Sequence, residues 1–386
     1  MRSVGYADAF SIPYFSGGNN MIKIVHIADV HLDSTFAGLS AREREERRAE
    51  LRRAFSRVCA ICREESVDLL LIAGDLFEND YVSGDTPSFV AAELSAIPDT
   101  RVFISPGNHD PYGARSPYRS ASFSDNVHIF TEPKISAVDI PSLNTTVYGY
   151  GFDSAFLRGS PLERFSVNDK SRINILCAHG DLGNPDSQYG GISEESLTRS
   201  FLDYAALGHI HTPGGFKKYG KTVCAYSGCL VGRGFDECGM RGAVVGEIKL
   251  GGASLKYRVV GDRRYESVEI SVSDARSDEE LVREIKGLCS DFGEKTSVKI
   301  VLSGMVSRKI SVTEGWLARE LPPLCELVLS DETIFVPDIS GMLSEQSLRG
   351  EFCRRASARL ESEDEHERQK AALALKLGLD ALHGLI

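Results

Sequence analysis

The sequence predicts an α/β fold built around parallel strands. Apolar runs repeatedly end in a short polar cluster, and stretches of helical character separate the runs. The first three runs cover Lys23–Asp29, Val67–Asp75 and Val102–Asn108, and Arg172–His179 and Tyr204–His211 repeat the arrangement further along. This alternation of strand, loop, helix and strand is typical of α/β proteins.

Composition and length set the class of protein. The chain has 386 residues, of which 42% are hydrophobic and 26% are charged, so we expect two or three domains with buried cores. Residues 1–20 lack the pattern of a secretory signal, and we expect them to form a disordered extension before a fold that starts at Met21. No apolar run approaches the roughly 20 residues of a membrane span. Nine cysteines, an odd number, favour free thiols, and we therefore expect a cytoplasmic protein without a membrane partner.

The chain is expected to divide into four parts. The extension over residues 1–20 precedes a main domain over residues 21–262. Residues 265–340 read as a small α+β domain, in which strands at 267–272, 297–302 and 325–329 alternate with helices at 277–292 and 312–321. Residues 344–386 form a helical tail that ends in an apolar stretch. Such a tail suits docking onto a partner helix or packing against its own domain.

The charge of the chain limits how it could bind nucleic acid. A net charge of −11 argues against a protein that coats nucleic acid with its whole surface. The helix expected over Ala41–Glu65 mixes arginine and glutamate, which is more typical of a solvated face than of a phosphate-binding one. A local basic groove remains compatible with the sequence, and its nearest candidates are Lys217, Lys218, Arg233, Arg241, Arg263 and Arg264.

The polar clusters point to a pair of metal ions. Carboxylate, amide and imidazole groups together suit divalent cations. Mixed imidazole and carboxylate ligation favours Mn²⁺ over Mg²⁺, and iron or zinc fits similar ligands. Loops at the carboxyl ends of strands converge on one edge of an α/β sheet, so clusters that are far apart in sequence are expected to meet. Two ions about 3.5–4 Å apart can share a water and clamp a phosphoryl group, which makes the chain a candidate hydrolase. The predicted ligands are Asp29, His31, Asp75, Asn108, His179, His209 and His211.

Two further residues are predicted to act in catalysis. His109 follows the ligand Asn108 and is better placed to stabilise phosphoryl charge, or to protonate a leaving alkoxide, than to bind metal. Asp110 is predicted to orient the His109 ring, as carboxylates often do for histidine.

The ordered clusters resemble the pattern of the calcineurin-like metallophosphoesterase superfamily: D-x-H, G-D, G-N-H-D, a lone histidine and G-H-x-H. Their flanks resemble bacterial DNA-repair exonucleases of the SbcD and YhaO type. These flanks are His31-Leu32-Asp33-Ser34, Gly74-Asp75-Leu76-Phe77, Leu207–Pro213 and the glycine-rich segment from Tyr226 to Gly242. The strong likeness covers roughly residues 22–260.

This resemblance implies a two-sheet sandwich flanked by helices, a small α+β capping domain and C-terminal helices. It also implies two Mn²⁺ ions at the seven predicted ligands, hydrolysis of DNA phosphodiesters assisted by His109, and a coiled-coil ATPase partner held by the C-terminal helices. A homodimer is a further expected assembly. The chain departs from the usual pattern at Glu78, where aspartate is common, and at Cys229 and Arg241, where a small hydroxyl residue and lysine are more usual.

Two other functions fit parts of the same pattern. A phosphatase or small-molecule phosphodiesterase could use the same metal core, but protein phosphatases of the superfamily carry Asp-Arg-Gly soon after Gly-Asp. Here Glu78-Asn79-Asp80 follows instead. A non-catalytic scaffold for an ATPase would be expected to lose ligands, and this sequence retains all seven.

Overall fold

The computed structural model describes residues 21–78, 81–273, 275, 277–307 and 309–382. The extension expected over residues 1–20 lies outside the described residues. The chain divides into two compact units, Met1–Arg264 and Tyr265–Ile386. The finer division into four parts stays a prediction.

The first sheet of the first unit carries three of the polar clusters. Its strand order is β12-β11-β1-β2-β3-β4, with β1 to β4 parallel and β11 antiparallel to both of its neighbours. The short apolar strand β2 is buried along its whole length, as expected of a central parallel strand. The strands are β1 (Met21–Ile27), β2 (Leu69–Ile72), β3 (Arg101–Ile104), β4 (Val127–Ile129), β11 (Gly242–Lys249) and β12 (Gly252–Val259).

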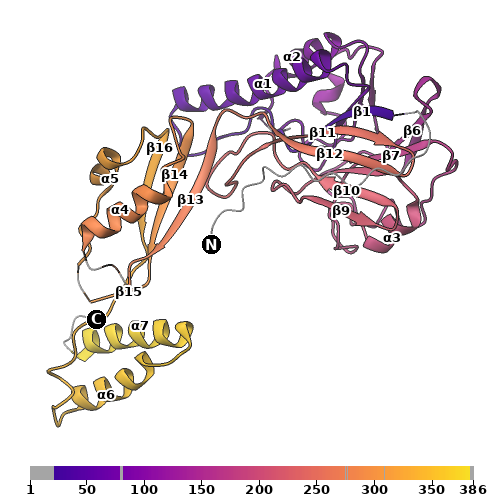
Figure 1. The fold of residues 1–386 in the computed structure, drawn as a ribbon. Coiled ribbons are helices and arrows are strands. Elements are labelled where there is room, and N and C mark those ends of the chain that lie inside the picture. The colour runs from indigo at the N-terminus through magenta and orange to yellow at the C-terminus, as the bar shows by residue number, and fades with distance from the viewer. Residues whose placement is uncertain (1–20, 79–80, 274, 276, 308, 383–386) are drawn as a thin grey trace. The chain divides into compact units, whose positions relative to one another are not determined.

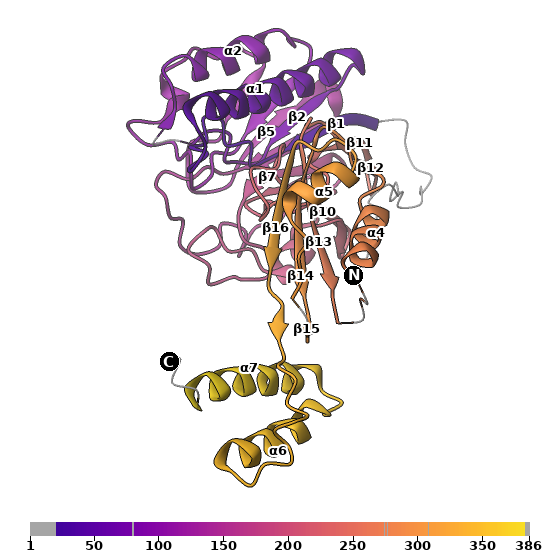
Figure 2. The same ribbon diagram turned by 90° about the vertical axis from the view of Figure 1, so that its left-hand side faces the viewer.

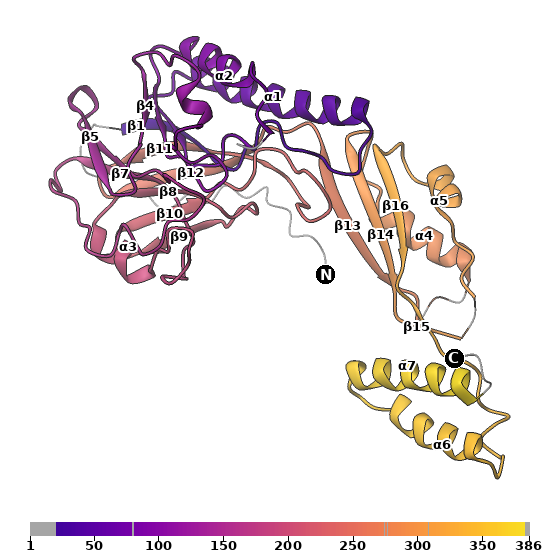
Figure 3. The ribbon, with the colours of Figure 1, turned by 180° about the vertical axis from the view of Figure 1, so that it is seen from behind.

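The second sheet carries the other two clusters. Its order is β5-β6-β7-β8-β10-β9, and the four central strands run parallel while β5 and β9 pair antiparallel at the edges. Figure 3 shows several of its strands from behind, with α3 beside β9 and β10. The strands are β5 (Ser136–Ile140), β6 (Thr145–Gly149), β7 (Ile173–His179), β8 (Tyr204–Gly208), β9 (Phe216–Tyr219) and β10 (Thr222–Tyr226).

The two sheets pack face to face. Leu69 and Leu71 of β2 belong to the same buried cluster as Ile175 and Cys177 of β7, so this cluster fills the space between the sheets. Alternate residues along a strand point to opposite faces, and Leu70 and Ile72 accordingly join a different cluster on the outer face of the first sheet. The α/β class and the two-sheet arrangement expected from the sequence are confirmed.

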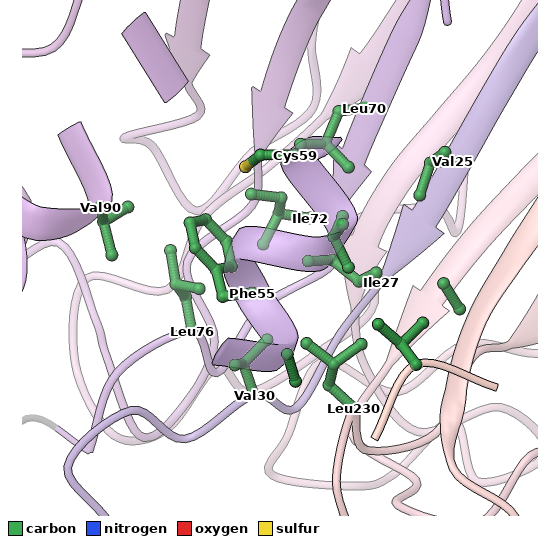
Figure 4. Close-up of a cluster of buried hydrophobic side chains, with 14 of the residues drawn as sticks. Val25, Ile27, Val30, Phe55, Cys59, Leu70, Ile72, Leu76, Val90 and Leu230 are labelled. Atoms are coloured by element: carbon green, nitrogen blue, oxygen red, sulfur yellow. The ribbon is translucent and has the colours of Figure 1, made fainter. Parts of the chain in front are cut away.

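Helices α1 (Ala41–Glu64) and α2 (Thr86–Ser95) cover the outer face of the first sheet (Figure 1). Ser40 and Glu43 form a capping box that fixes the start of α1 at the predicted residue. Figure 4 shows Phe55 and Cys59 of α1 packed near Ile72. The outer face of the second sheet packs on α3 (Glu194–Ser200) and on the loops around this helix. Two short 3₁₀ helices span Pro117–Arg119 and Pro141–Leu143.

The second unit contains a helix-covered sheet and a helix pair. Figure 2 shows α4 and α5 beside the sheet ordered β13-β14-β16, and Leu281 and Ile285 of α4 pack with Val298 and Ile300 of β14. The apolar residues Leu375 and Leu379 of α7 instead belong to a separate cluster with Cys353 of α6. The elements are β13 (Arg264–Ser271), α4 (Asp278–Leu288), β14 (Thr296–Ser303), β15 (Met305–Val306), α5 (Glu314–Glu320), β16 (Glu326–Asp331), β17 (Ile334–Phe335), α6 (Leu348–Leu360) and α7 (Glu365–Leu382).

None of the helices in the described part of the chain is both long enough and apolar enough to span a membrane.

The end of β8 lies very close to the ends of β1 and β2 in the facing sheet. A Cβ atom added at Gly208 would overlap the Ala73 carbonyl oxygen and lie 2.8 Å from the Ala28 Cβ. A side chain at this position is therefore incompatible with the observed spacing of the two sheets.

We expect Gly208→Ala to lower the free energy of unfolding by about 1–3 kcal/mol, since overpacking against rigid backbone forces the sheets apart. Urea unfolding measures this change. The matched control is Gly84→Ala, because an added Cβ there meets nothing within 4 Å. Equal stabilities of the two variants would show that the sheets are not held at this spacing.

Candidate metal centre

The five polar clusters converge at the carboxyl ends of strands from both sheets. Asp29 and His31 follow β1, Asp75 follows β2, and Asn108 follows β3, whereas His179 is the last residue of β7. His209 and His211 follow β8 directly. Ligand atoms of Asp29, His31 and His211 lie within 4.8 Å of one another, and so do those of Asp29, Asp75 and His179. The structure thus brings five of the seven predicted ligands together through their side-chain atoms: Asp29, His31, Asp75, His179 and His211.

Four of these residues have a left-handed backbone conformation that is rare outside glycine. The φ angles are 51° at Asp29, 48° at His31, 51° at Asp75 and 108° at His209. Each such residue costs of order 1–3 kcal/mol, so the surrounding structure must hold it in place. The amides of Asp29 and His31 donate to the carbonyls of Gly74 and Asp75, at 3.0 and 2.9 Å. The loops after β1 and β2 therefore fix each other's ligands.

Glycines before the ligands make room for ligands from other strands. A Cβ at Gly74 would overlap the His179 ring, and a Cβ at Gly107 would overlap the Asp75 carboxylate. Both glycines are thus required by packing, and Gly74 also has a φ of 90°, which favours glycine.

The inward nitrogens of His31 and His211 face each other. Their Nε2 atoms are 3.3 Å apart, while the Nδ1 atoms lie 3.1 Å from Glu78 and 2.7 Å from Glu237, respectively. A carboxylate can only accept, so each Nδ1 carries a proton, and in a neutral ring Nε2 then presents a lone pair. Arg233 Nη2 also lies 2.9 Å from Nδ1 of His211, but the shorter contact with Glu237 favours the same tautomer. Burial lowers the pKa of His31 to about 4, which keeps this ring neutral.

The second half of the centre repeats this arrangement with His179. Its Nδ1 donates to the Ala73 carbonyl at 3.0 Å, so its Nε2 presents a lone pair toward the Asp75 carboxylate at 3.4 Å. The side-chain oxygen of Asn108 lies 2.9 Å from the same nitrogen. Lone pairs of several groups directed at one another are the arrangement expected around a bound cation, so the donor set fits divalent metal.

The buried carboxylates support the same interpretation. Burial, together with the charge of Asp75, raises the pKa of Asp29 well above its usual range. Burial disfavours the ionised form of Asp75 and by itself would raise its pKa. The neighbouring His179, His31 and His109 have the larger combined effect, so the pKa of Asp75 is lowered. Two carboxylates in one buried space repel each other, and a cation between them would remove that repulsion.

His209 is placed differently from the other predicted ligands. Its backbone amide donates to both carboxylate oxygens of Asp29, at 3.1 and 3.2 Å. Its ring lies 5.2 Å from the His179 ring and 5.1 Å from the Tyr189 ring, measured between centroids. Its role as a metal ligand stays a prediction.

His109 lies at the open side of the centre. Its side chain is 44% exposed, and its ring makes an edge contact with His31 at 4.8 Å between centroids. The carboxylate that contacts its Nδ1 is that of Glu78, at 2.8 Å, and this hydrogen bond raises the pKa of His109 to about 9. The backbone amide of His109 donates to Asp75 at 2.9 Å, so the loop after β3 is also tied to the ligands.

Asp110 is fully buried, and its carboxylate is engaged by backbone amides and a tyrosine. It accepts hydrogen bonds from the amides of Gly107 and Leu76, at 2.6 and 2.7 Å, and from the Tyr118 hydroxyl. Burial and the charge of Asp75 raise its pKa to about 7. Asp110 thus joins the loops after β2 and β3, and its predicted effect on the orientation of the His109 ring stays a prediction.

Comparison with known proteins agrees with this geometry. The family model described as calcineurin-like phosphoesterase matches residues 22–213, which include all seven predicted ligands. Residues 22–213 form a calcineurin-like phosphoesterase domain.

Several curated proteins are similar to the chain beyond this phosphoesterase domain. An uncharacterized metallophosphoesterase, YhaO of Bacillus subtilis, is 26% identical over 82% of this chain and 80% of its own length. The DNA double-strand break repair protein Mre11 of Aeropyrum pernix is 26% identical, and the match covers 67% of this chain and 65% of that protein. The SbcD component of the nuclease SbcCD of Bacillus subtilis is 26% identical over 56% of this chain and 64% of its own length.

The phosphoesterase domain also uses residues whose contacts the sequence did not reveal. Glu78, which appeared only as a departure from the usual aspartate, contacts both His31 and His109. Glu237 of the glycine-rich segment accepts from His211 and from the guanidinium of Arg233. The contacts that Glu78 and Glu237 make with histidines could not be predicted from spacing along the chain, because each contact joins residues from separate loops.

We expect Asp29→Asn to abolish metal binding by the phosphoesterase domain without destabilising the chelator-treated protein, since the substitution removes a buried charge that Asp75 repels. Calorimetry with and without Mn²⁺ measures this. Wild-type protein should gain about 2.7 kcal/mol of stability at a metal concentration near 100 times Kd, and the variant should gain almost none.

The control for this experiment is Asp203→Asn. Asp203 is a buried carboxylate that accepts hydrogen bonds from Asn174, Lys221 and Gly251. It belongs to none of the residue groups that could hold a metal ion. This variant should be less stable than wild type but should keep the full gain from Mn²⁺. If Asp29→Asn kept that gain as well, Asp29 would not be a ligand.

Proposed function

We propose that the chain is a metal-dependent DNA nuclease that hydrolyses phosphodiester bonds. The observation that carries the proposal is the convergence of imidazole nitrogens and carboxylates from five strand ends beside the exposed ring of His109. Seven residues would hold two divalent cations, for which Mn²⁺ suits the mixed ligands. When bound, such cations lower the pKa of a water and neutralise the oxygens of a phosphoryl group.

His109 is proposed as the residue that acts on the leaving group. Its Nδ1 is engaged by Glu78, so its Nε2 is the nitrogen free to meet a substrate from the open side of the centre. A positioned imidazole can protonate a leaving alkoxide or stabilise charge on the phosphoryl oxygens. Asp110 is proposed to act through the backbone, because it holds Gly107 and Leu76 beside the ligands.

DNA as the substrate is supported by the relatives rather than by the site alone. Mre11 is named for DNA double-strand break repair and SbcD as part of a nuclease, and both are similar to much of this chain. Among the basic residues considered from the sequence, Arg241 is 4% exposed and Arg263 pairs with Glu50. Arg233 also pairs with a carboxylate, that of Glu237, but its guanidinium lies beside the proposed metal centre, 2.9 Å from Nδ1 of His211. Lys217 and Lys218 are exposed on β9. The proposed DNA-binding surface therefore involves Arg233, Lys217 and Lys218.

A coiled-coil ATPase is the proposed partner, as the resemblance implied for the C-terminal helices. One face of α7 packs on α6 through Leu375 and Leu379. Leu373 and Leu377, one helical turn apart, are 49% and 48% exposed on another face. An exposed apolar pair on a two-helix unit suits a helical partner.

The proposal is tested by comparing substrates. Wild-type protein with Mn²⁺ should cleave linear double-stranded or single-stranded DNA as well as bis(p-nitrophenyl) phosphate. Cleavage of the small ester alone, with no DNA cleavage when an ATPase partner is added, would favour the phosphatase or small-molecule phosphodiesterase function.

We expect His109→Ala to lower kcat about 10²- to 10⁴-fold, the usual contribution of a general acid, while bound Mn²⁺ stays at the wild-type level. Steady-state kinetics and elemental analysis measure the two quantities. The matched control is His366→Ala, an exposed histidine on α7 in the second unit. Unchanged kcat in His109→Ala would remove His109 from its assigned role.

A further inference from the structure

Arg233 lies in the glycine-rich segment and is held side-on by a buried carboxylate. Its Nε lies 3.1 Å from Oε1 of Glu237, and its Nη2 lies 2.7 Å from the same oxygen. Its backbone amide donates to Oε2 of Glu237 at 2.8 Å. Glu237 is only 3% exposed, and burial strengthens such a pair because little water screens it. Three donors of one residue therefore fix the guanidinium on one carboxylate.

The same pair places the guanidinium next to the metal centre. Oε1 of Glu237 also accepts from Nδ1 of His211 at 2.7 Å, and Nη2 of Arg233 lies 2.9 Å from that nitrogen. The His31 ring makes edge contacts with the rings of His211 and His109, at 5.0 and 4.8 Å between centroids. Arg233 and His109 therefore lie beside the same pair of predicted ligands.

The backbone around Arg233 is anchored as well. The buried side chain of Arg47 on α1 donates to the carbonyl of Gly232 at 2.7 Å, directly before Arg233. The amide of Cys229 donates to the carbonyl of His211 at 2.9 Å, which ties the same segment to a predicted ligand. The position of the guanidinium is thus set by the fold and not by a mobile surface loop.

One edge of the Arg233 guanidinium is free. A guanidinium has five N–H donors, and the contacts with Glu237 and His211 involve only Nε and Nη2. Within the described residues, no protein group accepts from Nη1. The side chain is 22% exposed, so part of it is accessible to a ligand. A fixed guanidinium with a free edge suits the oxygens of a phosphate group.

We propose that Arg233 is a further catalytic residue, whose free Nη1 edge donates hydrogen bonds to a non-bridging oxygen of the phosphoryl group under attack. This inference rests on the proposed function for the reaction, and it gives Arg233 a narrower role than a contact with the DNA backbone. The fixed guanidinium stabilises the charge that develops on the phosphoryl oxygens in the transition state. Arg233 keeps its protons throughout, and Glu237 is its positioning residue.

A purely structural role for Arg233 is the main alternative. In that role the guanidinium would serve only to neutralise Glu237, which also contacts His211 and Cys229. The side-on geometry argues against it. Pairing through both terminal nitrogens would neutralise the carboxylate equally well and would leave only Nε free, whereas the observed pairing leaves Nη1 beside the metal centre.

The test uses bis(p-nitrophenyl) phosphate, because this small diester has no DNA backbone. We expect Arg233→Ala to lower kcat about 10²- to 10³-fold, as for the loss of one charge-stabilising donor, with unchanged bound Mn²⁺ per chain. Arg233→Lys should keep an intermediate kcat, since lysine retains the charge but not the planar fork. Millimolar guanidinium should restore part of kcat in Arg233→Ala. The matched control is Arg57→Ala, which removes an arginine of α1 that pairs with Asp262 at 2.7 Å; its kcat should equal that of wild type.

A second readout does not depend on activity. Isothermal titration calorimetry of the Mn²⁺-loaded protein with inorganic phosphate should show about 10- to 100-fold weaker binding in Arg233→Ala and wild-type binding in Arg57→Ala. Equal phosphate affinities of the two variants would overturn the inference, and so would an unchanged kcat. Loss of bound Mn²⁺ in Arg233→Ala would overturn it too, because Arg233 would then act only through His211. Failure of the wild type to cleave DNA, with phosphate binding still dependent on Arg233, would count only against the proposed substrate.

Discussion

The close approach of lone pairs in a buried space is the constraint on which the rest of the structure depends. Nε2 of His31 lies 3.3 Å from Nε2 of His211, and Nε2 of His179 lies 3.4 Å from the Asp75 carboxylate. In the absence of a cation these groups would repel one another. Each outer nitrogen is held by an acceptor, so the rings cannot turn to relieve the repulsion. This arrangement supports the proposal that these side chains bind metal.

Glycines and strained loops allow the ligand side chains to approach one another this closely. Gly74 and Gly107 allow ligands from neighbouring strands to approach, and Gly208 allows the two sheets to meet. The positive φ angles at Asp29, His31 and Asp75 turn their side chains into the space that results. Bound metal would offset the cost of the strain and of the buried charges, so the proposed metal centre explains the structure better than a scaffold without metal does.

Much of the fold and of the site was predictable because the relevant signals are local. The strand ends, the capping box of α1 and the ligand clusters are each defined by residues only a few positions apart in the sequence. The edge strand β9 and the three-residue β4 are too short to give a clear periodicity, and the sequence did not reveal them. Contacts between loops were not predictable either: Glu78 reaches His109 across 31 positions, whereas the adjacent Asp110 is buried in the core. Arg241 shows the same limit, since the sequence could not distinguish a buried arginine from a surface one.

A titration with Mn²⁺ followed by electron paramagnetic resonance tests the central claim most directly, because it reports both the number of ions and their separation. The structure predicts two ions per chain with the spectrum of an exchange-coupled pair, as expected for ions about 3.5–4 Å apart. A single ion per chain with the six-line spectrum of isolated Mn²⁺ would contradict a shared two-metal centre.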